Sequence, residues 1–300
     1  MRWLPRFILL SAVLVVTAAA PAAEGPAPAL ALAGRTFEYE VVQGDYLIRI
    51  AARFGEAATL IARENGLPIN RPIHPGQRLA LDNRHIVPAG QEEGLLINLP
   101  QRHLFLFRQG RLLAAYPVGL GKPDWPTPSG AFRVNELRRH PVWHVPPSIQ
   151  EEMRRQGQVV RTQVPPGPDN PLGDFWIGLS IHGLGIHGTV APASVYHFRS
   201  HGCIRLHPAD VQALYAEVAP GLSGRIIYEP ILLAGFPDGR IYLEVNPDVY
   251  HRRGDAWQAL NDLAKTQGLA ERIDWAKARD VVARQEGIAR AVQRTSGNGP

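Results

Sequence analysis

The 300-residue chain contains only one cysteine, Cys203. A single cysteine excludes an internal disulfide framework, and it also excludes zinc sites built on paired cysteines. In an exported protein such a residue is either a free thiol or an intermolecular bridge. Residues 200–206 around it are polar and include His201, which disfavours the alternative of a small buried hydrophobic side chain. Cys203 is therefore a candidate nucleophile.

Long apolar runs are absent after the N-terminus. The one such run, residues 7–20, follows Arg2 and Arg6 and leads into small residues as far as Ala23, which is the pattern of a secretory signal peptide. We therefore expect a signal peptide at residues 1–23, export to the periplasm or cell envelope, and no integral membrane span after signal removal. The run is short for a membrane span, but the sequence leaves open whether the signal is cleaved.

Clusters of basic and aromatic residues are also missing. The formal net charge is +5, and two of these charges are Arg2 and Arg6 of the predicted signal, which leaves +3 on the mature chain. Scattered lysine and arginine residues give no footprint for nucleic acid, so we expect no nucleic acid partner. A modest positive charge suits an anionic cell-envelope setting.

Residues 24–35 are rich in alanine and proline and are predicted to be a linker. The next segment, residues 36–82, carries signals for a strand, two helices and a strand. After an alternating strand, Gly44 and Asp45 offer a turn with Asp45 as the N-cap of the first helix, and Gly55 ends that helix. A second short helix and a closing strand complete the segment.

Four motifs in this segment resemble a LysM module, namely Val42-Gln43-Gly44-Asp45, Ile50-Ala51, Ile61-Ala62-Arg63-Glu64-Asn65-Gly66 and Pro75-Gly76-Gln77-Arg78-Leu79. The resemblance implies a small α+β module of order βααβ that binds the N-acetylglucosamine-containing glycan strands of peptidoglycan. Its candidate glycan-binding residues are Gly44, Asp45 and Asn65. The alternative is that Gly44 and Asp45 serve only as turn and cap, because a shared fold does not guarantee a shared function.

Residues 94–229 are dominated by short β-type segments. Residues 95–99 and 104–107 are predicted strands, and a turn at 108–111 leads into a third. Proline and glycine punctuate residues 119–173, whose core we expect to be mainly β with long loops that carry function. Apolar spacing predicts a helix over residues 208–218, directly after the cysteine, and then a closing strand.

Residues 230–300 form a predicted C-terminal extension. A hairpin turn at Pro237-Asp238-Gly239 joins two apolar segments that we expect to extend the preceding sheet. Apolar residues after Asp255 predict two helices packed on the catalytic region, and residues 295–300 are predicted to be disordered. The predicted fold is therefore a mainly β, sandwich-type domain with one helix after the nucleophile, a small α+β module before it and a helical extension behind it.

Thiolate is the attacking form of cysteine, so we expect the site to hold the Cys203 sulfur deprotonated near neutral pH with the help of an imidazole. His201 lies two residues away on the same short turn, where its ring need not face the sulfur. His187 lies on a separate β-like segment that can pack beside it, so we assign His187 as the general acid and base. A backbone carbonyl such as that of Gly188 is a candidate to orient the ring.

Gly202 permits a tight turn before the nucleophile, and its amide and that of Cys203 can point at a developing oxyanion. Two partners are open for Arg205, a substrate carboxylate and a structural salt bridge. A metal site is the main chemical alternative, because several potential ligands cluster in the sequence: His182, His187, His197, His201, Cys203 and His207. Their spacing matches no familiar zinc pattern, so we expect no metal and no other cofactor.

One other enzyme class and the remaining histidines are weaker candidates for a role in the chemistry. The residues usual around a papain-like nucleophile are absent, which disfavours that class of protease. The remaining histidines show no pattern that links them to the site, and they are predicted to be surface or packing residues: His74, His85, His103, His140, His144 and His251.

The run Ile186-His187-Gly188-Thr189 followed by Ser200-His201-Gly202-Cys203-Ile204-Arg205 is similar to the active-site motif of the L,D-transpeptidase (YkuD-type) catalytic domain. Supporting segments include Thr127-Pro128-Ser129-Gly130 and Asn170-Pro171-Leu172-Gly173. The resemblance implies that residues 94–229 form this domain, with Ser200, His201, Gly202 and Gly188 supporting the nucleophile. Other members carry Asn in place of Arg205, which leaves the role of Arg205 as a substrate-binding residue open.

The family implication is a peptidoglycan reaction. Cys203 would cleave the L,D bond before the terminal D-Ala of a tetrapeptide stem, and the resulting thioester would pass to an amine. The sequence leaves three acceptors open, namely another stem peptide, a lysine of an envelope lipoprotein and water. It also leaves open a peptidoglycan-binding scaffold with a silent catalytic domain, and a hydrolase that removes cross-links or lipoprotein.

Overall fold

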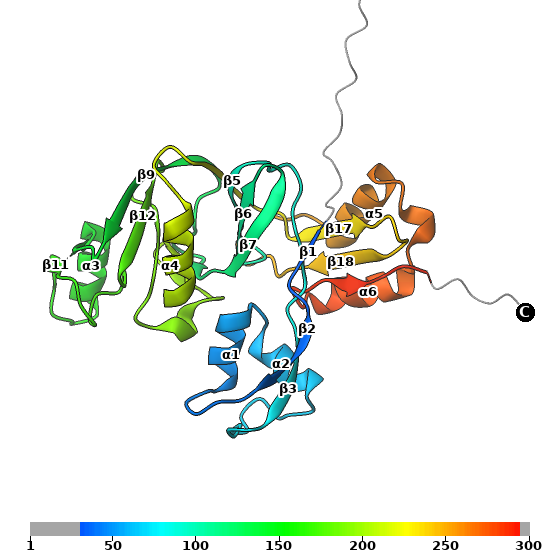
Figure 1. The fold of residues 1–300 in the computed structure, drawn as a ribbon, viewed down its shortest axis with the longest axis horizontal. Helices are drawn as coiled ribbons and strands as arrows, with labels where there is room; N and C mark the ends of the chain where they lie inside the picture. The colour runs from blue at the N-terminus through cyan, green and yellow to red at the C-terminus, as the bar shows by residue number, and fades with distance from the viewer. Residues whose placement is uncertain (1–30, 295–300) are drawn as a thin grey trace, which may run out of the picture.

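The computed structural model describes residues 31–294, so the predicted signal peptide, most of the predicted linker and residues 295–300 lie outside the described part of the chain. Within this range the chain forms three parts, each with its own apolar core. They are an N-terminal module (residues 36–82), a central domain (94–227) and a C-terminal unit (231–294). Figure 1 shows the N-terminal module below the other two, with the central domain to the left and the C-terminal unit to the right.

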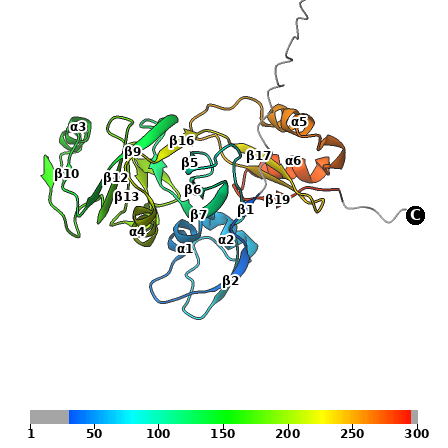
Figure 2. The same cartoon turned by 45° about the horizontal axis from the view of Figure 1, so that its top comes forward.

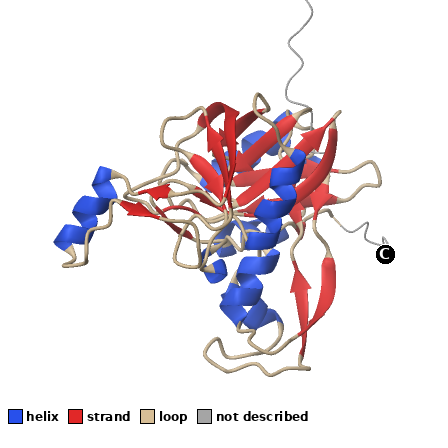
Figure 3. Cartoon of the chain, turned by 60° about the vertical axis from the view of Figure 1, so that its left-hand side comes forward, coloured by secondary structure: helices blue, strands red, loops and turns tan. Residues whose placement is uncertain are grey.

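The N-terminal module has the predicted order of strand, helix, helix and strand. β2 (Thr36–Glu40) pairs antiparallel with β3 (Arg78–Asp82), and between them the chain forms α1 (Leu47–Phe54) and α2 (Ala58–Glu64). Figure 3 shows the two strands beside the helices at the bottom of the molecule. The module has a core of apolar side chains from both helices, from β3 and from the residue after β2: Val41, Leu47, Ile50, Ala51, Ile61, Ala62, Leu79 and Leu81.

The two ends of α1 differ in how well the sequence predicts them. Gly55 ends the helix in the left-handed conformation (φ 75°), which glycine adopts without steric cost. The predicted N-cap is wrong, because the cap position is Tyr46. The Asp45 carboxylate instead accepts hydrogen bonds from the Val42 N–H at 3.0 Å and the Tyr39 hydroxyl at 2.6 Å. Asp45 therefore fixes the turn before the helix.

A short strand lies at the end of the segment that the sequence predicts to be a linker. β1 (Leu32–Ala33) pairs antiparallel with β4 (His85–Ile86). Ala33 is buried against the central domain, and Ile86 is buried against the C-terminal unit. Burial of these apolar side chains explains why the end of the alanine-rich segment is ordered.

An eight-stranded sheet forms the central domain, in the order β15-β13-β12-β9-β16-β5-β6-β7. The β13–β15 and β16–β5 pairs are parallel, and the other pairs are antiparallel. Its strands are β5 (Gly94–Asn98), β6 (His103–Arg108), β7 (Arg111–Pro117), β9 (Gly130–Arg139), β12 (Phe175–Leu179), β13 (Gly185–His187), β15 (Ile204–Arg205) and β16 (Ser223–Ile227). Two smaller pairs join β8 (Leu120–Gly121) to β14 (Phe198–Ser200) and β10 (Trp143–His144) to β11 (Gln163–Val164). The mainly β prediction is confirmed.

β5 is buried on both faces because two cores cover it. Leu95 and Ile97 face the main core, whereas Leu96 between them faces a smaller core that includes Phe105. This follows from the alternation of side chains along a strand. The predicted helix after the cysteine is α4 (Pro208–Glu217), whose apolar residues complete the main core. Figure 1 shows α4 beside β12.

The long loops expected in residues 119–173 are interrupted by two regular elements whose bounds the sequence does not indicate. β9 is ten residues long and lies inside the sheet between β12 and β16, and α3 (Pro147–Arg155) forms a separate helix. The sequence of β9 places charged and polar residues among its apolar ones, and much of the strand is partly or fully exposed. It therefore lacks the apolar run that indicates a buried strand.

The C-terminal unit is a three-stranded antiparallel sheet with two helices on one face. Its elements are β17 (Ile231–Gly235), β18 (Ile241–Val245), α5 (Ala256–Thr266), α6 (Trp275–Arg284) and β19 (Arg290–Ala291), and short 3-10 helices lie at Ala270–Arg272 here and at Pro192–Ser194 in the central domain. The predicted hairpin and helices are present. The hairpin forms a sheet of its own instead of extending the central one, and the helices pack on that sheet instead of on the central domain. Figure 2 shows α5 and α6 beside β17 and β19.

One buried carboxylate joins all three parts. Glu244 of β18 accepts hydrogen bonds from the Ile86 N–H at 2.7 Å and from the Gln101 side-chain amide at 3.0 Å, and it lies 3.1 Å from His85 Nδ1. The other ring nitrogen of His85 lies 3.0 Å from the carbonyl oxygen of Gly55 in the N-terminal module. Buried polar groups that satisfy one another in this way favour a single arrangement of the parts.

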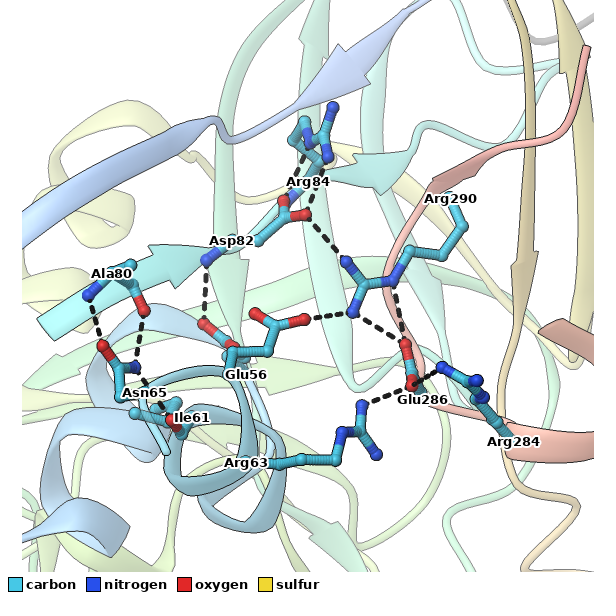
Figure 4. A network of polar contacts seen from close by, with 11 residues as sticks. Glu56, Ile61, Arg63, Asn65, Ala80, Asp82, Arg84, Arg284, Glu286 and Arg290 are labelled. Carbon is cyan, nitrogen blue, oxygen red and sulfur yellow. Dashed lines mark hydrogen bonds and ion pairs between the residues drawn. The ribbon is translucent and has the colours of Figure 1, made fainter. Parts of the chain in front are cut away.

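Ion pairs also hold the N-terminal module against the C-terminal unit, as Figure 4 shows. Arg290 of β19 pairs with Asp82 of β3 at 3.3 Å, with Glu286 at 2.7 Å and with Glu64 of α2. Glu286 also pairs with Arg63 of α2. Salt screens partly buried pairs less than exposed ones, so this network is expected to persist at physiological ionic strength.

Glu56 is a buried acid at this contact. Its side chain is 0% exposed, one oxygen accepts a hydrogen bond from the Asp82 N–H at 3.1 Å, and the other has no partner within residues 31–294. Burial raises the pKa of Glu56 to about 8, although the hydrogen bond from Asp82 opposes the shift. Glu56 is therefore mostly protonated at neutral pH.

Candidate active site

The candidate nucleophile lies at an edge of the central sheet. β13 and β15 run parallel, with Ile186 opposite Ile204 and His187 opposite Arg205. Both isoleucines are buried in the main core, so strand alternation directs His187 and Arg205 to the other face. Cys203 precedes β15, two residues before Arg205, and alternation places it on that same face. The fold thus brings the predicted nucleophile and the predicted base onto neighbouring strands.

Cys203 contributes to a cleft with a volume of about 240 Å³. Its charged lining residues are Glu136 and Arg138 of β9. The other lining residues are mostly apolar: Pro141, Val142, Trp143, His144, Pro146, Leu172, Trp176 and Gly183. A mostly apolar cleft with a few polar groups is typical of a ligand site. His144 lies in this cleft, so the expectation that it has no link to the site is wrong.

The His187 ring is buried and oriented by the backbone. The side chain is 3% exposed, and Nδ1 lies 2.6 Å from the carbonyl oxygen of Gly188, to which it donates. Burial and the positive charge of Arg205 together lower the pKa of His187 to about 4, although the Gly188 and Leu172 carbonyls oppose the shift. The imidazole is therefore neutral at pH 7, with Nε2 as its proton acceptor.

The Cys203 thiol is half-buried, and its sulfur lies 3.7 Å from the carbonyl oxygen of Gly183. Burial raises the pKa of Cys203, while the backbone of Gly185 and the charge of Arg205 lower it, and burial dominates. The resting pair is thus a thiol and a neutral imidazole. This differs from the sequence expectation of a resting thiolate, because a single sequence motif does not show how far the sulfur is removed from water.

Arg205 is charged but largely removed from water. Burial lowers the pKa of Arg205, and its Nε atom is buried without a hydrogen-bond partner in residues 31–294. No carboxylate in this described range forms a salt bridge with it, so the structure gives no support to the salt-bridge alternative. A partly buried guanidinium that has no carboxylate partner in this range and lies beside a nucleophile is well placed to stabilise negative charge on a neighbouring group.

His201 is engaged by a different set of contacts. Its Nε2 lies 2.5 Å from a Glu152 carboxylate oxygen on α3, and its ring lies 4.6 Å from the Trp125 ring. Lys122 pairs with the same carboxylate at 3.1 Å. These contacts fasten the nucleophile turn to α3.

The turn before the nucleophile leaves two amides free. Gly202 has φ 101°, a backbone conformation that residues other than glycine rarely adopt. The buried Ser200 hydroxyl donates to the carbonyl oxygen of Cys203 at 2.5 Å, and the Thr127 hydroxyl donates to that of Gly202 at 2.7 Å. The N–H groups of Gly202 and Cys203 have no hydrogen-bond partner in the described part of the chain. They are available to a substrate oxygen.

Trp176 is a site residue that the sequence reasoning missed. It lies opposite His187 in the β12–β13 register, and the two rings stack with centroids 6.0 Å apart. The Trp176 indole N–H donates to Glu136 at 3.1 Å. A Cβ atom on Gly185 would lie 2.3 Å from the Trp176 ring, so this position requires glycine. No local motif links Trp176 to His187, because their contact depends on strand pairing.

The three candidate glycan-binding residues have structural contacts of their own. The Arg49 side chain donates to the Gly44 carbonyl oxygen at 3.3 Å, and Asp45 fixes the adjacent turn. The Asn65 amide donates to the carbonyl oxygens of Ile61 and Ala80 and accepts from the Ala80 N–H, all within 2.9 Å. These bonds occupy both amide protons of Asn65.

Potential metal ligands are scattered. Within residues 31–294, no group of three or more His, Cys, Asp and Glu side chains is arranged to hold a metal ion. His207 lies at the N-terminus of α4, where its ring accepts a hydrogen bond from the Ala209 N–H at 3.4 Å.

Comparison with known proteins identifies both regions. Residues 92–227 match the L,D-transpeptidase catalytic domain, YkuD, and residues 39–82 match the LysM domain. The chain is 30% identical over 269 residues to the probable L,D-transpeptidase YcfS of Escherichia coli strain K12, in a match that covers 86% of this chain and 83% of that protein. The chain belongs to the L,D-transpeptidase family.

Other relatives of this transpeptidase carry the same family name. The probable L,D-transpeptidase ErfK/SrfK of Salmonella typhimurium is 27% identical over 247 residues, with 79% of each chain covered. Among solved structures, the L,D-transpeptidase from Mycobacterium smegmatis has 22% identity and a TM-score of 0.34, and the match covers 51% of this chain and 63% of that one.

Family membership makes this protein an enzyme of the L,D-transpeptidase class, whose general role is peptidoglycan cross-linking. The LysM domain implies peptidoglycan binding, and together these features indicate a location in the cell envelope. A search of residues 31–294 finds no helix with the length and apolar content needed to cross a membrane.

Replacing Asn65 by alanine tests whether this LysM residue is structural. The change removes three hydrogen bonds that join Asn65 to Ile61 and Ala80, each worth about 0.5–1.5 kcal/mol, so we expect the free energy of unfolding to fall by about 1–3 kcal/mol. Urea denaturation measures this, with the exposed Gln43→Ala as control. We expect sacculus binding at temperatures below unfolding to stay intact, whereas lost binding in a folded variant would make Asn65 a glycan ligand.

Proposed function

We propose that this transpeptidase transfers the acyl group of a peptidoglycan stem through a thioester on Cys203. The observation that supports the proposal is the placement of the thiol in the cleft, one residue before the strand that pairs with the His187 strand. The cleft supplies an apolar surface for a peptide, and the sheet edge supplies a nucleophile and a base.

In the first step, the Cys203 sulfur attacks the carbonyl carbon of the L,D-peptide bond before the terminal D-Ala of a tetrapeptide stem, whose third residue is typically diaminopimelate. His187 Nε2 takes the thiol proton as the carbon–sulfur bond forms, and it returns this proton to the D-Ala nitrogen as the carbon–nitrogen bond breaks. Because both groups are neutral at pH 7, proton transfer accompanies the attack. The Gly188 carbonyl holds the ring in the tautomer that this requires.

Charge that develops in this step has two sources of stabilisation. The free N–H groups of Gly202 and Cys203 are positioned to donate to the oxyanion of the tetrahedral intermediate. Arg205 stabilises negative charge on the sulfur, in line with its effect on the pKa of Cys203. Ser200 and His201 hold the turn that presents these groups.

In the second step, a neutral amine attacks the carbonyl carbon of the thioester and the carbon–sulfur bond breaks. His187 Nε2 takes a proton from the amine and passes it to the sulfur, so that Cys203 leaves as the thiol. The amine of another stem gives a 3-3 cross-link, a lysine of an envelope lipoprotein gives an anchored protein, and water in place of the amine gives a shortened stem. The LysM domain raises the local concentration of stems by holding the enzyme on glycan strands.

The proposal is tested with the purified enzyme and a disaccharide tetrapeptide. Intact-mass spectrometry is expected to show an adduct equal to the stem without its D-Ala, together with free D-Ala. Muropeptide analysis of cells with and without the protein then identifies the acceptor from new 3-3 cross-links, attached lipoprotein or tripeptide stems. Sacculus binding with neither adduct nor D-Ala would contradict acyl transfer and identify a scaffold.

A further inference from the structure

A segment of the C-terminal unit reaches the turn that carries the nucleophile. Residues 246–255 join β18 to α5, and Tyr250 within them packs against the main core of the central domain. Its ring lies 5.4 Å from that of Phe198 and 5.8 Å from that of Tyr228. The segment therefore connects the C-terminal unit to the neighbourhood of the active site.

The Tyr250 hydroxyl holds two backbone groups that are six residues apart. It donates to the carbonyl oxygen of Gly121 at 2.6 Å and accepts from the Thr127 N–H at 3.2 Å. One phenol thus closes the loop between β8 and β9 at its base.

Thr127 connects this loop to Gly202, the residue before the nucleophile, by a hydrogen bond. Its side chain is 0% exposed, its hydroxyl accepts from the Gly121 N–H at 3.0 Å, and the same hydroxyl donates to the Gly202 carbonyl oxygen at 2.7 Å. The Gly202 carbonyl and the Cys203 N–H belong to one planar peptide unit and point in opposite directions. A bond that fixes the Gly202 carbonyl therefore also fixes the direction of the Cys203 N–H.

The backbone of Tyr250 is fixed by hydrogen bonds of its own. Its N–H donates to the Tyr228 hydroxyl at 3.1 Å, and that hydroxyl donates to Asp248 at 2.5 Å. Asp248 also accepts from the N–H groups of Arg252 and Arg253 at 3.0 and 2.9 Å. The position of the phenol is consequently set by the segment from the C-terminal unit.

We propose that Tyr250 and Thr127 are positioning residues that aim the Cys203 N–H at the substrate oxyanion. This inference rests on the proposed acyl transfer at Cys203. Gly202 has a left-handed φ and no side chain, so its peptide can rotate unless its carbonyl is held. The C-terminal unit therefore takes part in acyl transfer by ordering one peptide plane.

The experiment compares acylation with simple alkylation of the same thiol. Tyr250→Phe removes only the hydroxyl and is expected to lower kcat for D-Ala release roughly tenfold, with KM unchanged, because small displacements of catalytic groups are costly. Thr127→Val acts directly on the Gly202 carbonyl and is expected to lower kcat roughly a hundredfold. Alkylation of Cys203 by iodoacetamide forms no oxyanion, so its rate and pH profile should stay at wild-type values in both variants.

Three controls separate positioning from loss of structure. Thr127→Ser keeps the hydroxyl and should restore most of the activity, and Tyr116→Phe on β7 removes a phenol from the same core and should have no effect on kcat. Adding Tyr250→Phe to Thr127→Val should lower kcat no further, because both residues act through the hydrogen bond between the Thr127 hydroxyl and the Gly202 carbonyl oxygen. A fall in alkylation and kcat together, or an unchanged kcat in Tyr250→Phe, would overturn the inference.

Failure of the proposed function has a different signature. In that case the wild-type enzyme itself releases no D-Ala, and positioning is then tested by hydrogen exchange. Tyr250→Phe should speed amide exchange in the peptide that spans residues 200–205, whereas Tyr116→Phe should leave it unchanged. Equal exchange in the wild type and Tyr250→Phe would overturn the positioning role.

Discussion

Cys203→Ala is expected to reduce D-Ala release and adduct formation to background, a loss of roughly 10⁴-fold or more, because the change removes the sulfur that attacks the acyl carbon in the proposed mechanism. The fold should remain intact. The sulfur makes only a weak contact with the Gly183 carbonyl at 3.7 Å, so the variant should lose no more than about 1 kcal/mol of stability. D-Ala release, intact mass and circular dichroism measure the three properties.

Cys203→Ser provides the sharper control. Serine keeps the size and hydrogen-bonding capacity of the side chain, but its hydroxyl is a far weaker acid than a thiol. His187, with its pKa of about 4, is too weak a base to activate it. We expect no ester adduct, and sacculus binding at the wild-type level. Turnover in Cys203→Ala would place the chemistry on another residue and contradict the proposed mechanism.

Glu56→Gln is expected to change how stability depends on pH. The folded-state pKa of Glu56 is about 8, above its ordinary value of 4.5 in the unfolded chain. Between these values the folded protein binds one proton more than the unfolded protein, so wild-type stability falls as pH rises, by about 1.4 kcal/mol per pH unit. The variant lacks this titration. Its stability relative to wild type should therefore increase by about 3 kcal/mol from pH 5 to pH 7.5, as measured by urea denaturation at each pH.

The control for Glu56 is an exposed glutamate of the same module. Glu40 lies on β2 and is exposed, so Glu40→Gln should leave the pH profile of stability parallel to that of the wild type. Parallel profiles for Glu56→Gln and the wild type would show that the Glu56 carboxyl is ionised in the folded protein. That result would contradict the burial of a protonated acid between the N-terminal module and the C-terminal unit.

Elements with strong local signals were predicted well. The helix over 208–217 follows from apolar spacing, and the hairpin of β6 and β7 follows from its turn, where Gln109 and Gly110 both have positive φ. The order of the LysM elements follows from contiguous motifs. In each case the determining residues lie within a few positions of one another, so the sequence contains the whole signal.

Elements that depend on distant partners were predicted poorly. β9 has no apolar run because much of it is exposed, and its place in the sheet depends on pairing with β12 and β16. The C-terminal hairpin forms a sheet of its own because α5 and α6 supply its cover. The local sequence favours Asp45 as a helix cap, but in the structure its carboxylate accepts hydrogen bonds from the Tyr39 hydroxyl and the Val42 N–H in the preceding turn.

The sequence by itself determined the candidate chemistry, because the single cysteine, the glycine before it and the histidine at position 187 are fixed by the order of amino acids. Only the tertiary structure decided the state of that chemistry. Burial keeps both the Cys203 thiol and the His187 imidazole neutral, and Trp176 stacks on His187 through strand pairing. The hydrogen bond that the Thr127 N–H donates to the Tyr250 hydroxyl joins residues 123 positions apart. Desolvation and hydrogen bonds between distant segments exist only after the chain has folded, so no local pattern encodes them.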